Sequence, residues 1–235
     1  MGKGKLRRFE EMNTFENVIQ APFEEVFKKD FHLKNNWHKE VFKNNHPIVL
    51  ELGCGKGEYT LGLAQKFPEK NFIGIDIKGA RMWKGASEAL HNKLENTRFL
   101  RTRIEFITAF FARDEISEIW ITFPDPQIKK RRNKKRLTSS RFLNAYKQIL
   151  KEDGVIHLKT DSAELYSYTQ EIIHFNKLNN IYCTEDLYHS DLQDEILNIH
   201  TFYEQMFLDE GKKITYTKFS LQNCSKITEP PDEEE

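Results

Sequence analysis

The sequence predicts an α/β fold in which a mostly parallel sheet of seven strands is covered by helices on both faces. Short apolar runs rich in isoleucine, valine and phenylalanine alternate with longer segments whose apolar residues recur at helical spacing. Several of these runs end on glycine, proline or an acidic residue, as buried strands do where the chain leaves a sheet. The predicted strands are 48–52, 71–77, 98–101, 119–123, 155–159, 182–188 and 214–221.

Helical patterns fill the intervals between most of these strands. The segment after the first strand carries Leu61, Ala64 and Phe67 on one face, and Pro68 lies just past its end. Segment 192–208, between the last two strands, is more helical than extended but is not a clean crossover helix. We therefore expect these two strands to form an antiparallel addition at one edge of the sheet.

Length and composition indicate one domain with short appendages. A chain of 235 residues can bury a sizeable core. The expected parts are a basic arm and helical lead-in over 1–45, the main domain over 46–228 and an acidic, disordered tail over 229–235. Three scattered cysteines, and the lack of an apolar leader or membrane-length run, predict a cytoplasmic protein with no membrane contact. The eight histidines form no ligand cluster, so we expect no metal site.

A glycine-rich turn follows the first predicted strand, in the order Glu51-Leu52-Gly53-Cys54-Gly55-Lys56-Gly57. Glycines at such a turn let a ligand approach the backbone. The spacing differs from the Gly-x-Gly-x-x-Gly of dinucleotide-binding folds, which makes a dehydrogenase the least favoured alternative. Glu51 would disfavour a pyrophosphate and suits a cationic ligand, while Asp76 ends the second strand and can bind a ribose diol. These residues favour S-adenosylmethionine as the cofactor, with another nucleotide-binding fold as the alternative.

The most informative stretch runs from Ile119 to Arg136. Its apolar strand stops on Pro124-Asp125-Pro126, because neither proline can donate a ladder hydrogen bond. Asp125 is therefore held in a stiff turn at the carboxyl end of a strand, where ligands bind in open α/β sheets. Seven cationic residues follow in the eight positions 129–136. Such a run alone is more often a solvated face, but its place beside a rigid acid predicts chemistry on a polyanion.

This stretch resembles a known family. Phe123-Pro124-Asp125-Pro126-Gln127-Ile128-Lys129-Lys130-Arg131 is similar to the Phe-Pro-Asp-Pro-Trp-Pro-Lys-Lys-Arg form of the tRNA (guanine-N7-)-methyltransferases. The resemblance extends from the glycine turn through Thr160-Asp161 to Thr217-Lys218-Phe219. It implies a Rossmann-like class I S-adenosylmethionine-dependent methyltransferase that acts on the variable-loop guanosine of tRNA. We expect a monomer or a homodimer.

The resemblance also assigns roles to individual residues. Asp125 is expected to be catalytic and to contact the cofactor. The other expected cofactor-binding residues are Glu51, Gly53, Gly55, Asp76, Arg103 and Ile104. The expected substrate-binding residues are Lys129, Asp161, Thr217, Lys218, Phe219 and Ser220. The expected RNA-binding residues are Arg131, Arg132, Asn133, Lys134, Lys135 and Arg136.

Three departures from the family pattern keep other functions open. The family's Gly-Asp-Ala is Thr102-Arg103-Ile104 here, and its Trp-Pro is Gln127-Ile128. Its closing Thr-x-Tyr/Phe-Glu is assigned to Thr217-Lys218-Phe219-Ser220, which lacks the final carboxylate. The alternatives are a methyltransferase of another RNA or of a protein amide, or a non-catalytic RNA-binding relative.

The implied chemistry requires few acid or base residues. Guanine N7 carries a lone pair and no proton at neutral pH, so methyl transfer depends on alignment and not on a strong base. The nucleobase becomes cationic during the transfer, and a fixed carboxylate such as Asp125 would stabilise that charge.

Overall fold

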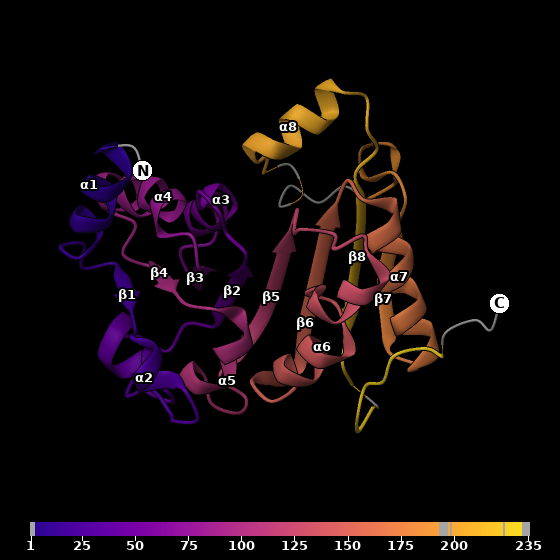
Figure 1. Cartoon of the computed structure of the whole chain (residues 1–235), viewed down its shortest axis with the longest axis horizontal. Coiled ribbons are helices and arrows are strands. Elements are labelled where there is room, and N and C mark those ends of the chain that lie inside the picture. Colours follow the sequence, from indigo (N-terminus) through magenta and orange to yellow (C-terminus); the bar gives the residue numbers. More distant parts are fainter. Residues whose placement is uncertain (1–2, 193–196, 198, 223, 232–235) are drawn as a thin grey trace.

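An eight-stranded sheet runs through the centre of the molecule (Figure 1). The computed structural model describes residues 3–192, 197, 199–222 and 224–231. The strands are β1 (Val18–Gln20), β2 (Ile48–Leu52), β3 (Asn71–Asp76), β4 (Thr97–Arg101), β5 (Ile116–Thr122), β6 (Leu150–Thr160), β7 (Asn179–Thr184) and β8 (Thr215–Ser220). They lie in the order β1-β4-β3-β2-β5-β6-β8-β7. All neighbouring pairs are parallel except the two that involve β8, which confirms the mostly parallel sheet and its antiparallel addition.

Helices cover both faces of the sheet, as predicted. They are α1 (Lys3–Met12), α2 (Phe23–Val26), α3 (Glu58–Lys66), α4 (Gly79–His91), α5 (Ile107–Phe110), α6 (Ser140–Tyr146), α7 (Ala163–Phe175) and α8 (Phe202–Asp209). Alternation along β2 points Ile48 and Leu50 into the larger core, which α5, α6 and α7 complete. Val49 points to the opposite face, where it packs with Tyr59 and Leu63 of α3.

The order of the strands reverses between β2 and β5. From β2 the chain moves outward to β3 and β4, and it then returns to place β5 on the other side of β2. Ligands of open α/β sheets bind at such a reversal, at the carboxyl ends of the strands. Glu51 of β2 is paired with Trp120 of β5, and Thr122 is paired with Lys159 of β6. The ends of these strands therefore meet at one edge, which we call the site edge.

The sheet has one strand more than expected, because Val18–Gln20 pairs with β4. A strand of three residues is too short to leave a periodic pattern in the sequence. α1 precedes it and packs along α4, where the Trp83 indole donates to the Glu11 carboxylate at 2.7 Å. The basic segment that was expected to be an arm is therefore part of the folded unit from residue 3 onward.

The start of the expected acidic tail is also held in place. Glu229 accepts hydrogen bonds from the Ser140 amide at 2.8 Å and from the Tyr168 hydroxyl at 2.7 Å. Its carboxylate thus satisfies a free amide in the first turn of α6. The prediction of disorder is wrong for Glu229, and residues 232–235 lie outside the described part of the chain.

The described residues contain neither a membrane-spanning helix nor a cluster of metal ligands. Over residues 3–192, 197, 199–222 and 224–231, no helix has the length and apolar character needed to cross a membrane. Within the same ranges, no group of three or more histidine, cysteine or acidic side chains is placed to hold a metal ion.

Candidate functional site

The glycine-rich turn joins β2 to α3 at the site edge. The amides of Gly53 and Cys54 both donate to the Ile75 carbonyl, at 2.8 and 3.0 Å, which draws the turn over the end of β3. Gly53, Gly55 and Gly57 all have positive φ, of 80°, 56° and 74°, where residues with a Cβ are disfavoured. The backbone path therefore requires glycine at these positions, and it leaves the turn open to a ligand.

Glu51 lies beneath this turn and is 3% exposed. One carboxylate oxygen accepts hydrogen bonds from the Thr60 amide at 2.8 Å and from the Thr60 hydroxyl, and the other accepts from the Thr122 hydroxyl at 2.7 Å. Burial away from water raises the pKa of Glu51 to about 7, and the hydrogen bonds from Thr60 and Thr122 oppose that rise. A cation placed next to this carboxyl group would favour its ionised form.

Asp76 ends β3 and is partly exposed. Its two oxygens accept from the amides of Gly55 at 3.0 Å and Lys78 at 2.8 Å. These bonds fix the rotamer of the side chain, and each carboxylate oxygen can accept a further hydrogen bond. Asp76 therefore keeps acceptor positions free for the ribose diol that was expected there.

A cavity of about 170 Å³ opens beside Ile77, the residue that follows Asp76. Thr102 and Arg103, which follow β4, also line it. Arg103, one of the residues expected to bind the cofactor, thus borders this cavity. Ile104 differs, because its side chain packs against the larger hydrophobic core.

Asp125 lies in an exposed loop that begins at the end of β5. Phe123 and Gln127, on either side of Pro-Asp-Pro, have positive φ of 47° and 48°. This conformation costs on the order of 1 kcal/mol for residues other than glycine, so the surrounding contacts must enforce it. The Phe123 amide donates to the Lys159 carbonyl at 2.8 Å, and the Gln127 amide donates to Asp125 Oδ1 at 3.1 Å. The carboxylate is thus held at the site edge and remains open to solvent.

Residues 129–136, which we call the basic strip, continue from this loop. Lys130–Lys135 of the strip form a 3₁₀ turn. Asn133 in this turn is partly buried. The exposed cationic side chains of the strip are Lys129, Arg131, Arg132, Lys134 and Lys135. These side chains present a concentrated positive charge next to Asp125.

Arg136 differs from the rest of the strip because it is only 4% exposed. Its guanidinium donates to the Pro126 carbonyl at 3.1 Å and to Glu164 at 3.2 Å, and it lies 4.4 Å from the centre of the Tyr168 ring. The RNA-binding role expected for Arg136 therefore does not fit the structure. This residue anchors the loop that carries Asp125 to α7.

The substrate contacts expected for four residues of β8 do not fit the structure either. The four residues are Thr217, Lys218, Phe219 and Ser220. β8 runs antiparallel to β6 and away from the site edge, so that Thr215 pairs with Thr160 at that edge whereas Ser220 pairs with Val155. All four except Lys218 are also buried.

The complete family pattern, with its carboxylate, is instead Thr201-Phe202-Tyr203-Glu204. It begins α8, which lies over the carboxyl ends of β5 and β6 (Figure 1). Thr201 Oγ1 accepts from the Glu204 amide at 3.1 Å, and Glu204 Oε2 accepts from the Thr201 amide at 3.4 Å. This reciprocal capping box was the sequence feature that could have located the segment.

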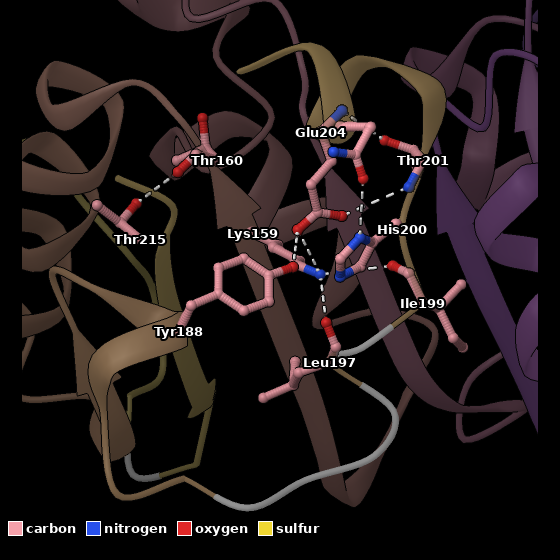
Figure 2. A network of polar contacts seen from close by, with 10 residues as sticks. Lys159, Thr160, Tyr188, Leu197, Ile199, His200, Thr201, Glu204 and Thr215 are labelled. Atoms are coloured by element: carbon pink, nitrogen blue, oxygen red, sulfur yellow. Dashed lines mark hydrogen bonds and ion pairs between the residues drawn. The ribbon is translucent and has the colours of Figure 1, made fainter. Parts of the chain in front are cut away.

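Glu204 is completely buried, and so is its ion-pair partner Lys159 near the end of β6 (Figure 2). Lys159 Nζ lies 2.7 Å from Glu204 Oε1 and donates to the Leu197 carbonyl at 2.6 Å. The Tyr188 hydroxyl donates to the same Glu204 oxygen at 2.5 Å. Burial lowers the pKa of Lys159, and Glu204 opposes that change. The network fastens the first turn of α8 to the sheet.

α8 also contacts both of the loops that form the site. The Phe202 amide donates to Glu58, just after the glycine turn, at 2.8 Å. Lys56 Nζ, within that turn, lies 3.8 Å from the centre of the Phe202 ring. At the other end of the helix, the Phe207 and Phe123 rings pack with centres 5.8 Å apart. α8 therefore bridges the glycine turn and the loop that carries Asp125.

Two further expected residues lie close to this edge. Asp161 directly follows β6, and its carboxylate is 3.4 Å from Lys212 Nζ. Lys129 is exposed at the start of the basic strip. The structure thus gathers most of the expected site residues at one edge, and it separates Arg136 and residues 217–220 from them.

This combination of sheet order, glycine turn and strand-end acids defines a class I methyltransferase. A family model described as "Putative methyltransferase" matches residues 45–217. A tRNA (guanine-N(7)-)-methyltransferase of Bacteroides thetaiotaomicron is 54% identical over 98% of this chain and 90% of its own length. One of Christiangramia forsetii is 54% identical over 94% of this chain and 99% of its own length. The chain belongs to the tRNA (guanine-N7-)-methyltransferase family.

Solved structures share the fold at much lower identity. An antibiotic-related methyltransferase has a TM-score of 0.59 at 16% identity, covering 83% of this chain and 96% of its own. The 16S rRNA methyltransferase KamB has a TM-score of 0.58 at 12% identity, covering 82% and 92%. These likenesses concern the fold alone, and they confirm the predicted fold class.

Replacing Lys159 by Met should lower the free energy of unfolding by about 3–5 kcal/mol, because it leaves the Glu204 carboxylate buried without its partner. Denaturation in urea measures this loss. Lys212→Met removes a more exposed lysine from the same edge and should lower the free energy of unfolding far less than Lys159→Met does. Adding Glu204→Leu to Lys159→Met should restore part of the stability, and a larger loss in the double variant would contradict the pairing.

Proposed function

We propose that this protein transfers a methyl group from S-adenosylmethionine to N7 of the variable-loop guanosine of tRNA. The observation that carries the proposal is that two sets of residues lie at one edge of the sheet. One set is the glycine turn with Glu51 and Asp76, and the other is the loop with Asp125 and the exposed basic strip. The relatives at 54% identity are named for this reaction, which supports the substrate. In this proposal the protein acts in the cytoplasm.

The residues of the glycine turn fit the cofactor by their chemistry. Glu51 can ionise beneath the turn and would favour an ammonium group there. Asp76 would accept hydrogen bonds from ribose hydroxyls, and Arg103 and Ile104 would offer backbone contacts on the adenine side. S-adenosylmethionine supplies an electrophilic methyl group on a sulfonium, so the protein needs to align the donor and the acceptor and to exclude water.

Asp125 would act on the guanine. Because N7 already carries a lone pair, no proton has to be removed before the transfer. Positive charge develops on the base as the new bond forms, and a carboxylate fixed at the site edge stabilises that charge. The turn geometry holds the carboxylate in place, so little reorganisation is needed when the charge appears.

The basic strip would bind the RNA backbone. Its exposed lysines and arginines can neutralise phosphates, which gives affinity without reading the sequence. Lys129 and Asp161 would lie closest to the target nucleotide. Of the segment Thr201–Glu204, the exposed Phe202 and Tyr203 would lie on the substrate side, and the buried Glu204 would hold them in place.

Incubation with labelled S-adenosylmethionine and unmodified tRNA, followed by nucleoside analysis, tests the proposed function. We expect label in N7-methylguanosine. Asp125→Ala should lower kcat by about 100-fold or more with the fold intact, because it removes the charge that stabilises the methylated base. Asp153→Ala, an exposed acid at the opposite edge of the sheet, serves as the control. Failure to label tRNA, or label in another nucleoside, would contradict the proposal.

Binding of S-adenosylhomocysteine should tighten between pH 6 and pH 7.5, because Glu51 must lose a proton to pair with the ligand's ammonium group. Because burial raises the pKa of Glu51 in the folded protein to about 7, the protonated form prevails below pH 7 in the absence of ligand. Calorimetry across this range measures the effect. Glu51→Gln should bind more weakly with a flatter pH dependence, and an unchanged pH dependence in this variant would contradict the assignment.

Reversing two charges of the strip, in Lys134→Glu with Lys135→Glu, should raise the KM for tRNA by about tenfold or more. The affinity for S-adenosylhomocysteine should stay the same, because both side chains are exposed outside the glycine turn. Lys151→Glu with Lys226→Glu changes the net charge equally at exposed positions away from the strip. Equal effects of the two double variants on the KM would show that the position of the strip is irrelevant.

A further inference from the structure

Residues 20–26, which we call the N-terminal segment, form one side of the cavity beside Ile77. Phe23, at the start of α2, lines this cavity together with Ile77 and Phe106. Phe23 is 50% exposed and Ile77 is 49% exposed, so two large apolar side chains next to the site are incompletely covered. Large apolar side chains that border a cavity and remain exposed mark a place where a ligand can bind.

The position of Phe23 is fixed by its neighbours. Its ring stacks on that of Phe27 with centres 4.8 Å apart and meets the edge of Phe106 at 5.6 Å. Phe106 belongs to the turn that follows β4, so the contact joins the N-terminal segment to the chain next to Arg103. The ring of Phe23 is therefore held against the cavity by an aromatic cluster.

Arg101 fastens the same segment from the opposite direction. Its guanidinium donates to the Gln20 side chain at 2.9 Å and to the Ile77 carbonyl at 3.4 Å. The same group lies 4.8 Å from the centre of the Phe9 ring of α1. One side chain thus connects β1 and α1 to the residues that follow Asp76. Arg101 therefore links the strand just before Phe23 to the residue just after Asp76, the acid that would bind the ribose.

We propose that Phe23 packs against the adenine ring of S-adenosylmethionine and makes the N-terminal segment part of the cofactor site. This inference rests on the cofactor assignment of the proposed function. Asp76 would bind the ribose, and the adenine would extend past Ile77 into the cavity between Phe23 and the residues after β4. An aromatic ring stacks well on a purine, whose face is also a π-system. Phe23 lies outside residues 45–217, so this contact is added to the part of the chain that the family model matches.

If the Phe23 ring packs against the adenine, Phe23→Ala should selectively weaken cofactor binding. In calorimetry with the full chain and S-adenosylhomocysteine, the Kd should rise about tenfold, as is typical when a stacked aromatic side chain is removed. Phe23→Tyr keeps the ring and should bind within about twofold of the unchanged protein. Phe175→Ala removes an equally exposed phenylalanine, 47% exposed at the end of α7, and should also leave the Kd unchanged.

A Kd for Phe23→Ala that matches that of Phe175→Ala would overturn the proposal. Failure of every form of the protein to bind S-adenosylhomocysteine would overturn the cofactor assignment, and with it the proposed contact between Phe23 and the adenine. The titration contains no RNA, so an error in the tRNA assignment would not change its result. In methyl-transfer assays Phe23→Ala should raise the KM for S-adenosylmethionine and leave the KM for tRNA unchanged.

Discussion

The candidate site depends on the buried carboxylate of Glu51, because it joins the three elements β2, α3 and β5. Its hydrogen bonds to Thr60 and Thr122 hold α3 and β5 against β2. A carboxylate removed from water is destabilised unless it is well paired, and its raised pKa expresses that cost. A positively charged ligand above the glycine turn would remove part of the cost. The fold thereby favours a cation at the point where the strand order reverses.

Two segments from opposite ends of the chain flank the candidate site at the ends of the central strands. α8 lies on the side of β5 and β6, where the buried pair of Lys159 and Glu204 fastens the helix to the sheet. β1 lies on the side of β3 and β4, where Arg101 joins it to the residue after Asp76. The Phe23 ring of α2 lies on the same side and is held by the rings of Phe27 and Phe106. A sheet found in many proteins thus acquires features particular to this chain.

The sequence was sufficient to predict the central strands and the acids at their ends. Glu51, Asp76 and Asp125 each lie at or just after the end of an apolar run. Because parallel strands end at a common edge, the local patterns were enough to predict that these three acids lie at the same edge of the sheet. The local patterns could not predict which charged side chains are buried or which partners they contact. Arg136 reads as one more cation of the strip, and only the contacts with α7 show that it is buried.

Segments 201–204 and 217–220 show why a short motif is ambiguous without the fold. Both contain a threonine followed two positions later by an aromatic residue. The pairing of β8 with β6 directs the second segment away from the site, whereas the ion pair of Glu204 with Lys159 holds the first at the site edge. The three-residue strand β1 escaped prediction for a different reason, because its pairing with β4 is set by the tertiary fold and not by its own pattern.

The central claim is that this sheet edge presents a methyl donor to N7 of one guanosine. Its most direct test uses two tRNAs that differ only in the variable-loop guanosine, which in one of them is 7-deazaguanosine, with carbon in place of N7. The account predicts that the unchanged tRNA is methylated and that the deaza tRNA binds with similar affinity but receives no methyl group. Equal methylation of both tRNAs would contradict the account.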